Sequence, residues 1–123
     1  MSKMIGYMEG TDALWLTSLQ ILEYDTLPLS NGWDGHGMNI LQLSPQQHVD
    51  VVVGYLHKIM PPKWTETTAQ ELLHATKVYD IPVLIVCPKA DHATARQRIG
   101  HLPSNVTLVD PSAVLETIKK TTG

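Results

Sequence analysis

The side chains best suited to chemistry gather in a glycine-rich stretch, residues 32–40, which reads GWDGHGMNI. Asp34 and His36 stand there among three glycines, and glycine is used where a backbone bends sharply or approaches another group closely. An imidazole can serve as a general base in catalysis. The stretch is therefore a candidate catalytic or cofactor loop. The alternative is a polar turn in which the Asp34 carboxylate accepts hydrogen bonds from nearby amides.

A second group of polar side chains follows the segments that are expected to be strands. Ligands of open parallel sheets bind outside the carboxyl ends of the strands, where the free amides of helix N-termini attract anions. We place residues 9–12, 44–47, 88–92 and 110–112 at such ends. The glycine-rich stretch precedes its predicted strand, so it is expected at the opposite edge. The predicted ligand-binding residues are Glu9, Asp12, Asp34, Lys89, Asp91 and His92.

Cys87, the only cysteine, ends an apolar run and could act as a nucleophile. A thiolate is the reactive form of cysteine, and a histidine can accept the thiol proton. The placement of His36 about 50 residues upstream resembles that of caspase-like cysteine peptidases. This resemblance implies a hydrolase in which Cys87 is the nucleophile and His36 the base. Pro88 and the polar residues 30–33 depart from the pattern of that family, and the alternative is that Cys87 is a small buried hydrophobic residue.

Two further resemblances are incomplete. The sequence DGHGMNI is similar to the D-x-H-x-x-G loop of cobalamin-binding domains, but Asn39 stands where that family has glycine. Residues 9–14 are similar to the start of Toprim domains, but Lys89 replaces the first aspartate of their metal-binding Asp-x-Asp pair. The histidines form no zinc-binding spacing. The cofactor therefore stays unassigned, and no metal site is predicted.

The apolar pattern predicts the elements that would hold these side chains. We expect strands at residues 4–8, 38–43, 81–87 and 106–109, and helices at 45–60, 66–79, 91–99 and after 110. The helix at 45–60 has the clearest signals, a capping box at Ser44 and Gln47 and an apolar stripe. Residues 13–22 are interpreted as a helix capped by Thr11 or Asp12, and the alternative is a second strand over residues 15–21.

Alternating strands and helices imply a parallel sheet covered on both faces. The sequence thus predicts one α/β domain over residues 1–123, a small three-layer Rossmann-like or flavodoxin-like fold with a mostly parallel four- or five-stranded sheet. Apolar residues make up 43% of the 123-residue chain and charged residues 17%, which excludes a disordered chain.

The net charge of −3 gives no basic footprint, so a nucleic-acid partner is not expected. No apolar run is long enough for a membrane span, and the start of the chain has no signal-peptide pattern. A single cysteine can form no intramolecular disulfide, so a cytoplasmic location is expected.

Three hypotheses about function follow. The first is a ligand-binding or regulatory module that recognises a small anionic ligand or a protein partner at the strand carboxyl ends, with homo-oligomerisation left open. The second is the hydrolase that uses Cys87 and His36. The third is a structural interaction domain.

Overall fold

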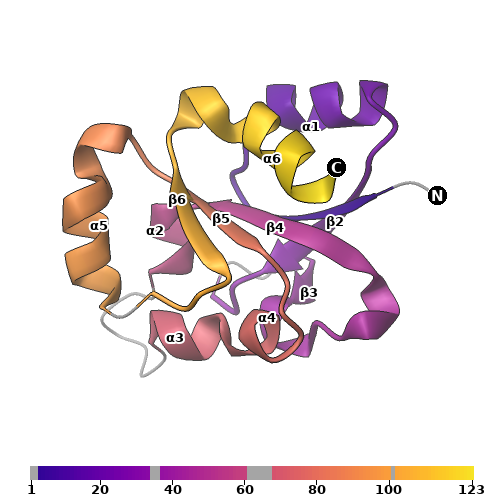
Figure 1. Ribbon diagram of the computed structural model, residues 1–123. Helices are drawn as coiled ribbons and strands as arrows, with labels where there is room; N and C mark the ends of the chain where they lie inside the picture. Colours follow the sequence, from indigo (N-terminus) through magenta and orange to yellow (C-terminus); the bar gives the residue numbers. More distant parts are fainter. Residues whose placement is uncertain (1–2, 34–36, 61–67, 101) are drawn as a thin grey trace.

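The computed structural model describes residues 3–33, 37–60, 68–100 and 102–123, and these residues form a six-stranded sheet (Figure 1). Every neighbouring pair of strands is parallel, and the strand order is β3-β2-β1-β4-β5-β6. This is the strand order of the Rossmann fold. The predicted α/β class is confirmed, whereas the predicted number of strands was too low. The strands are β1 Met4–Met8, β2 Asp25–Ser30, β3 Met38–Asn39, β4 Val49–Tyr55, β5 Val83–Val86 and β6 Val106–Val109.

Helices cover both faces of the sheet and make the fold three-layered (Figure 1). The helices are α1 Ala13–Ile21, α2 Leu56–Ile59, α3 Ala69–Leu72, α4 His74–Val78, α5 His92–Ile99 and α6 Val114–Thr122. Short 3-10 turns η1 Ile40–Gln42, η2 Pro45–Gln47, η3 Lys89–Asp91 and η4 Pro111–Ala113 lie between them. Helices α1 and α6 share one face, and α2 to α5 pack on the other.

The side chains of β4 show how the two cores are built. Val51 and Val53 belong to the core under α1 and α6, while Val52 belongs to the core on the opposite face. This alternation follows from the two-residue period of a strand. Since both faces of the central strands are covered, all four residues of β5 are buried as well.

The predicted helix over residues 45–60 is wrong. The capping box of Ser44 and Gln47 does form, but it starts only the three-residue turn η2, which ends at His48 with a φ of 53°. Strand β4 follows, and only Leu56–Ile59 are helical. A strand that is buried on both faces is apolar at nearly every position, so its sequence also contains the three- and four-residue spacings of a helix. The branched valines of β4 favour the strand.

Strand β2 was missed because Pro28 interrupts it, and proline lowers the expectation of a strand. The glycine-rich stretch was predicted at the edge opposite the strand carboxyl ends. This prediction is wrong, because the stretch follows β2 and so begins at the edge where the strands end. Met38 of β3 pairs with Leu29 of β2, so the chain turns back beside the strand that it has just left. The predicted strand 38–43 is limited to two residues, because the Asn39 side chain accepts a hydrogen bond from Leu41 N and caps η1.

Several local predictions are confirmed. Residues 13–21 are helical, and the Asp12 carboxylate accepts a hydrogen bond of 2.8 Å from Leu14 N at the start of α1. Gly100 ends α5 with a φ of 85°. The predicted helix at 66–79 is divided into α3 and α4, with Thr68 as the cap of α3, and Thr65 lies outside the described residues.

Candidate ligand-binding edge

The edge at which the parallel strands end, here called the carboxyl edge, carries most of the predicted site residues. Glu9 and Asp12 follow β1, and Lys89, Asp91 and His92 follow β5. These two groups are brought to the same edge because β1, β4 and β5 are parallel neighbours. Asp34 and His36 lie outside the described residues.

The segment at residues 44–47 does not belong to this edge, which corrects its predicted placement. It leads into β4, whose first residue, Val49, pairs with Met4 at the start of β1. The end of β4 takes its place and contributes Tyr55, Leu56 and His57. These three residues were not recognised as site residues because the sequence pattern placed them in the middle of a helix.

A pocket of about 390 Å³ lies among the ends of β4, β5 and β6. This volume falls within the range of small-molecule sites, which are mostly apolar with a few polar groups. Its lining is of that kind and comprises Tyr55, Leu56, His57, Val86, Cys87, Pro88, Asp91 and Pro111. The pocket also lies beside the switch point of the sheet, the β1–β4 pair at which the strand order reverses.

Three rings hold the wall of this pocket in place. The ring centroids of Trp15 and Tyr55 are 5.6 Å apart, and those of Tyr55 and His57 are 5.7 Å apart with an interplanar angle of 19°. Partial burial and the nearby Asp12 carboxylate raise the pKa of the Tyr55 phenol. Tyr55 therefore keeps its proton at neutral pH and can donate a hydrogen bond.

Two aspartates occupy the amides that could otherwise attract an anion. Asp12 caps α1, as described above. The Asp110 carboxylate accepts hydrogen bonds from Lys89 N at 2.9 Å and Ser112 N at 3.0 Å. These bonds, together with one from the Ser112 hydroxyl, lower the pKa of Asp110 to about 2. The backbone amides of the turns after β1 and β6 are therefore already hydrogen-bonded to the protein's own carboxylates.

The surroundings of Cys87 do not favour a nucleophile. Its side chain is only 4% exposed, and burial raises the pKa of the thiol, as do the Asp91 and Asp110 carboxylates more weakly. His92 Nε2 lies 3.0 Å from the carbonyl oxygen of Cys87, so this imidazole is engaged with the backbone. A reactive cysteine needs a lowered pKa. Pairing with His36 stays a prediction, because that residue is outside the described part of the chain.

A second pocket, of about 370 Å³, lies on the other side of the switch point. Its lining includes Glu9 and Gly10 after β1, and Gly37 from the glycine-rich stretch. Gly10 and Gly37 have φ values of 83° and 77°, which side chains other than glycine rarely adopt. The described end of the glycine-rich stretch therefore borders the carboxyl edge. Asn31, which is buried, strengthens this region by donating a hydrogen bond of 3.1 Å to the Lys58 carbonyl oxygen.

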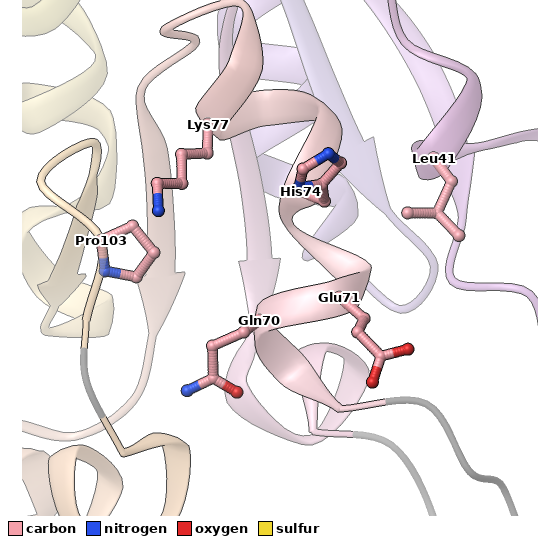
Figure 2. A pocket seen from close by; sticks show the side chains of 6 residues that line it. All are labelled: Leu41, Gln70, Glu71, His74, Lys77 and Pro103. Carbon is pink, nitrogen blue, oxygen red and sulfur yellow. The ribbon is translucent and has the colours of Figure 1, made fainter.

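A third pocket, of about 520 Å³, lies elsewhere, along α3 and α4. Figure 2 shows its side chains, with Lys77 pointing toward Pro103 and Leu41 lying across from His74. Gln70 and Glu71 complete the lining, and none of the six residues belongs to the segments that directly follow β1, β4, β5 or β6. Its helical residues are exposed and include both a carboxylate and an ammonium group. Their side chains therefore favour no particular ligand charge, and they supply no aromatic wall like the one at Tyr55.

Comparisons with known proteins add no precedent for the carboxyl edge. No known family model, curated protein or solved structure matches this chain. Among the described residues, no group of three or more histidine, cysteine, aspartate or glutamate side chains is arranged to hold a metal ion. Likewise, no helix in the described ranges is long and apolar enough to cross a membrane.

Proposed function

We propose that this chain is a small-molecule-binding module whose ligand lies in the pocket among the ends of β4, β5 and β6. The observation that carries the proposal is the position of this pocket at the carboxyl ends of β4, β5 and β6, in a sheet with Rossmann strand order. Ligands of open α/β sheets bind outside the carboxyl ends of the strands, which is where this pocket lies. We expect the module to act in the cytoplasm, since its single cysteine offers no intramolecular disulfide.

The lining of the pocket favours a ligand with a flat ring. Leu56, Pro88 and Pro111 supply apolar surface, and Tyr55 supplies an aromatic wall that the stacked His57 supports. The carboxylate that lines the pocket belongs to Asp91, a hydrogen-bond acceptor when ionised. A planar ring that carries N–H donors would match both the apolar walls and this acceptor.

The proposal expects a neutral or cationic ligand, whereas the sequence predicted an anionic one. That prediction relied on free amides at helix N-termini, yet the carboxylates of Asp12 and Asp110 already accept hydrogen bonds from the amides after β1 and β6. Together with Asp91 they place negative charge around the pocket, so a neutral or cationic ring is favoured over an anionic one. Small probes of known charge are the direct test of this preference.

The test compares benzamidine with benzoate, two rings of nearly equal shape and opposite charge. Titration is followed through the backbone amide resonances of the isotope-labelled full chain. We expect benzamidine to shift the resonances of residues 55–57 and 87–91 and to bind more tightly than benzoate. Asp91→Asn should weaken benzamidine binding about tenfold, the effect of losing one charge-assisted hydrogen bond of about 1.5 kcal/mol. Asp80→Asn, an exposed change in the turn before β5, is the matched control and should leave binding unchanged.

The outcomes are distinct. Tighter binding of benzoate would support the anionic-ligand prediction instead. If neither probe shifts the resonances at the ends of β4 and β5, the pocket is not a ligand site and the proposal is wrong.

A further inference from the structure

Trp15 of α1 stands outside the pocket at the ends of β4, β5 and β6, yet it contacts the aromatic wall of that pocket. The lining of the pocket includes Tyr55 but not Trp15. The ring centroids of these two residues are 5.6 Å apart, and their ring planes are tilted by 40°. Aromatic pairs at such distances attract each other beyond the area that they bury. Trp15 is therefore placed to influence a bound ligand through Tyr55.

Helix α1 gives Trp15 a fixed position. Leu19 lies four residues further along the helix, is 1% exposed and packs in the core under α1 and α6. Residues four apart lie on the same face of a helix, so Trp15 is on the side of α1 that faces the sheet. The start of the helix is held as well, because the Asp12 carboxylate caps it by accepting the hydrogen bond from Leu14 N. The indole is thus anchored from both ends of its helix.

Tyr55 depends on such support because of its place in the chain. It is the last residue of β4 and is only half-buried. A tyrosine side chain has several staggered rotamers, and a flat wall forms only when the ring lies along the pocket. The second ring beside it belongs to His57, which is exposed and only two residues further along the same segment. Trp15 differs from His57 in that it comes from a separate, anchored element.

We propose that Trp15 is a positioning residue that holds the Tyr55 ring against the pocket and thereby gives the site its preference for planar ligands. This inference rests on the proposed ligand site and adds the residue that determines its specificity. Without the indole, Tyr55 is free to take other rotamers. The affinity of a ligand that needs the wall then falls by the fraction of molecules in which the wall is formed.

The test compares benzamidine with cyclohexanecarboxamidine, two amidinium cations of similar size that differ in the planarity of their rings. Binding to the full chain is followed through the backbone amide resonances of residues 87–91. Wild type should bind benzamidine more tightly. Trp15→Leu should weaken benzamidine binding about fivefold, within the range of one aromatic pair, and the binding of the saturated amidine by less than about twofold.

Two variants serve as controls. Trp15→Phe keeps a ring at this position and should restore most of the preference for benzamidine. Leu16→Ala changes the next residue of α1, which is also half-buried but does not line the pocket, and should leave the preference unchanged. Circular dichroism reports whether each variant keeps its fold.

A double-mutant cycle tests whether Trp15 acts through Tyr55. Tyr55→Leu removes the wall itself, so the addition of Trp15→Leu should weaken benzamidine binding no further. A measurement on the unsubstituted chain does not depend on any variant. Nuclear Overhauser effects should connect the benzamidine ring with the Tyr55 ring, and the Tyr55 ring with the Trp15 indole, but not benzamidine with the indole.

The positioning role is overturned, and the ligand site kept, if Trp15→Leu weakens the binding of both amidines equally or of neither. The same conclusion follows if wild type does not prefer benzamidine, if the double variant binds more weakly than Tyr55→Leu, or if benzamidine contacts the indole directly. Absence of any benzamidine binding to wild type would overturn the proposed function and this inference together.

Discussion

Gly54 of β4 lies directly against Met8 of β1, and its replacement by alanine tests the packing of these two strands. A Cβ atom added at Gly54 would lie 2.5 Å from Met8 Cγ and 2.9 Å from Met8 Cβ. The Met8 Cβ atom is tied directly to the backbone of β1, so it cannot move aside without moving the strand. Overpacking of this kind costs about 1–3 kcal/mol of folding free energy.

The net effect of Gly54→Ala combines this steric cost with a gain. Alanine restricts the unfolded chain more than glycine, which stabilises a compatible site by about 0.4–1 kcal/mol. With a steric cost at the upper end of its range, we expect a net loss of about 2 kcal/mol. An unfolding entropy of about 2.1 cal/mol/K per residue converts 1 kcal/mol into roughly 4 °C for this chain, so the Tm should fall by about 8 °C.

Gly6→Ala is the matched control for thermal denaturation followed by circular dichroism. The nearest contact of its added Cβ is 2.8 Å to Cδ1 of Leu29, the far end of a side chain that can rotate. The Tm of this variant should therefore fall by no more than about 4 °C, or about 1 kcal/mol. A double-mutant cycle adds Met8→Ala, which removes the Cγ atom, and Gly54→Ala should then cost less. An equal loss at Gly6 and Gly54, or no coupling to Met8, would refute the close β1–β4 packing.

Three other expectations concern the loops and the thiol. Gly37→Ala should destabilise the chain by more than about 1 kcal/mol, because its Cβ would lie 2.6 Å from the Pro28 carbonyl oxygen. Gly32→Ala is the control and should cost less, because the nearest contact of its added Cβ is 3.5 Å. Equal losses of Tm in the two variants would contradict the close approach of Gly37 to β2. The lowered pKa of Asp110, about 2, means that its carboxylate stabilises the fold above pH 4 and that this effect disappears as the pH falls toward 2. The Tm difference between wild type and Asp110→Ala should accordingly narrow over that range, and a constant difference would exclude the charge as its origin. The raised pKa of Cys87 predicts that alkylation by iodoacetamide is slow in the native protein and that its rate still rises steeply at about pH 9.5, one unit above the ordinary thiol pKa of ~8.5, whereas a rate that has levelled off there would indicate an ordinary thiol.

The comparison of sequence with structure separates local signals from those that depend on neighbours. Asp12 as the cap of α1, the capping box at Ser44 and Gly100 as the end of α5 with a positive φ were all correctly predicted, because each involves atoms only a few residues apart. The same local signal at Ser44 led to a wrong helix. A capping box specifies how a turn begins, but it does not specify how far the helix continues.

The site depended more strongly on the tertiary structure. Acidic and basic residues after β1 and β5 were identified from sequence, because a strand followed by a turn is a local pattern. The aromatic wall at Tyr55 and His57 was missed, since the sequence does not show that β4 lies between β1 and β5. The same missing information placed the glycine-rich stretch at the wrong edge, because Pro28 hid the strand that precedes it.

The sequence by itself determined the α/β class, several turns, the starts of α1, α5 and α6, and the apolar segments that form the cores. Only the tertiary structure decided that β4 is a strand, that six strands assemble in Rossmann order, and that Tyr55, Asp91 and Pro111 line one pocket. The physical reason is that a strand buried on both faces gains its stability from partners distant in sequence, so its own residues are compatible with either helix or strand. Leu14 and Ile21 illustrate the same limit, because their apolar character is evident in the sequence, whereas their exposure is visible only in the folded chain.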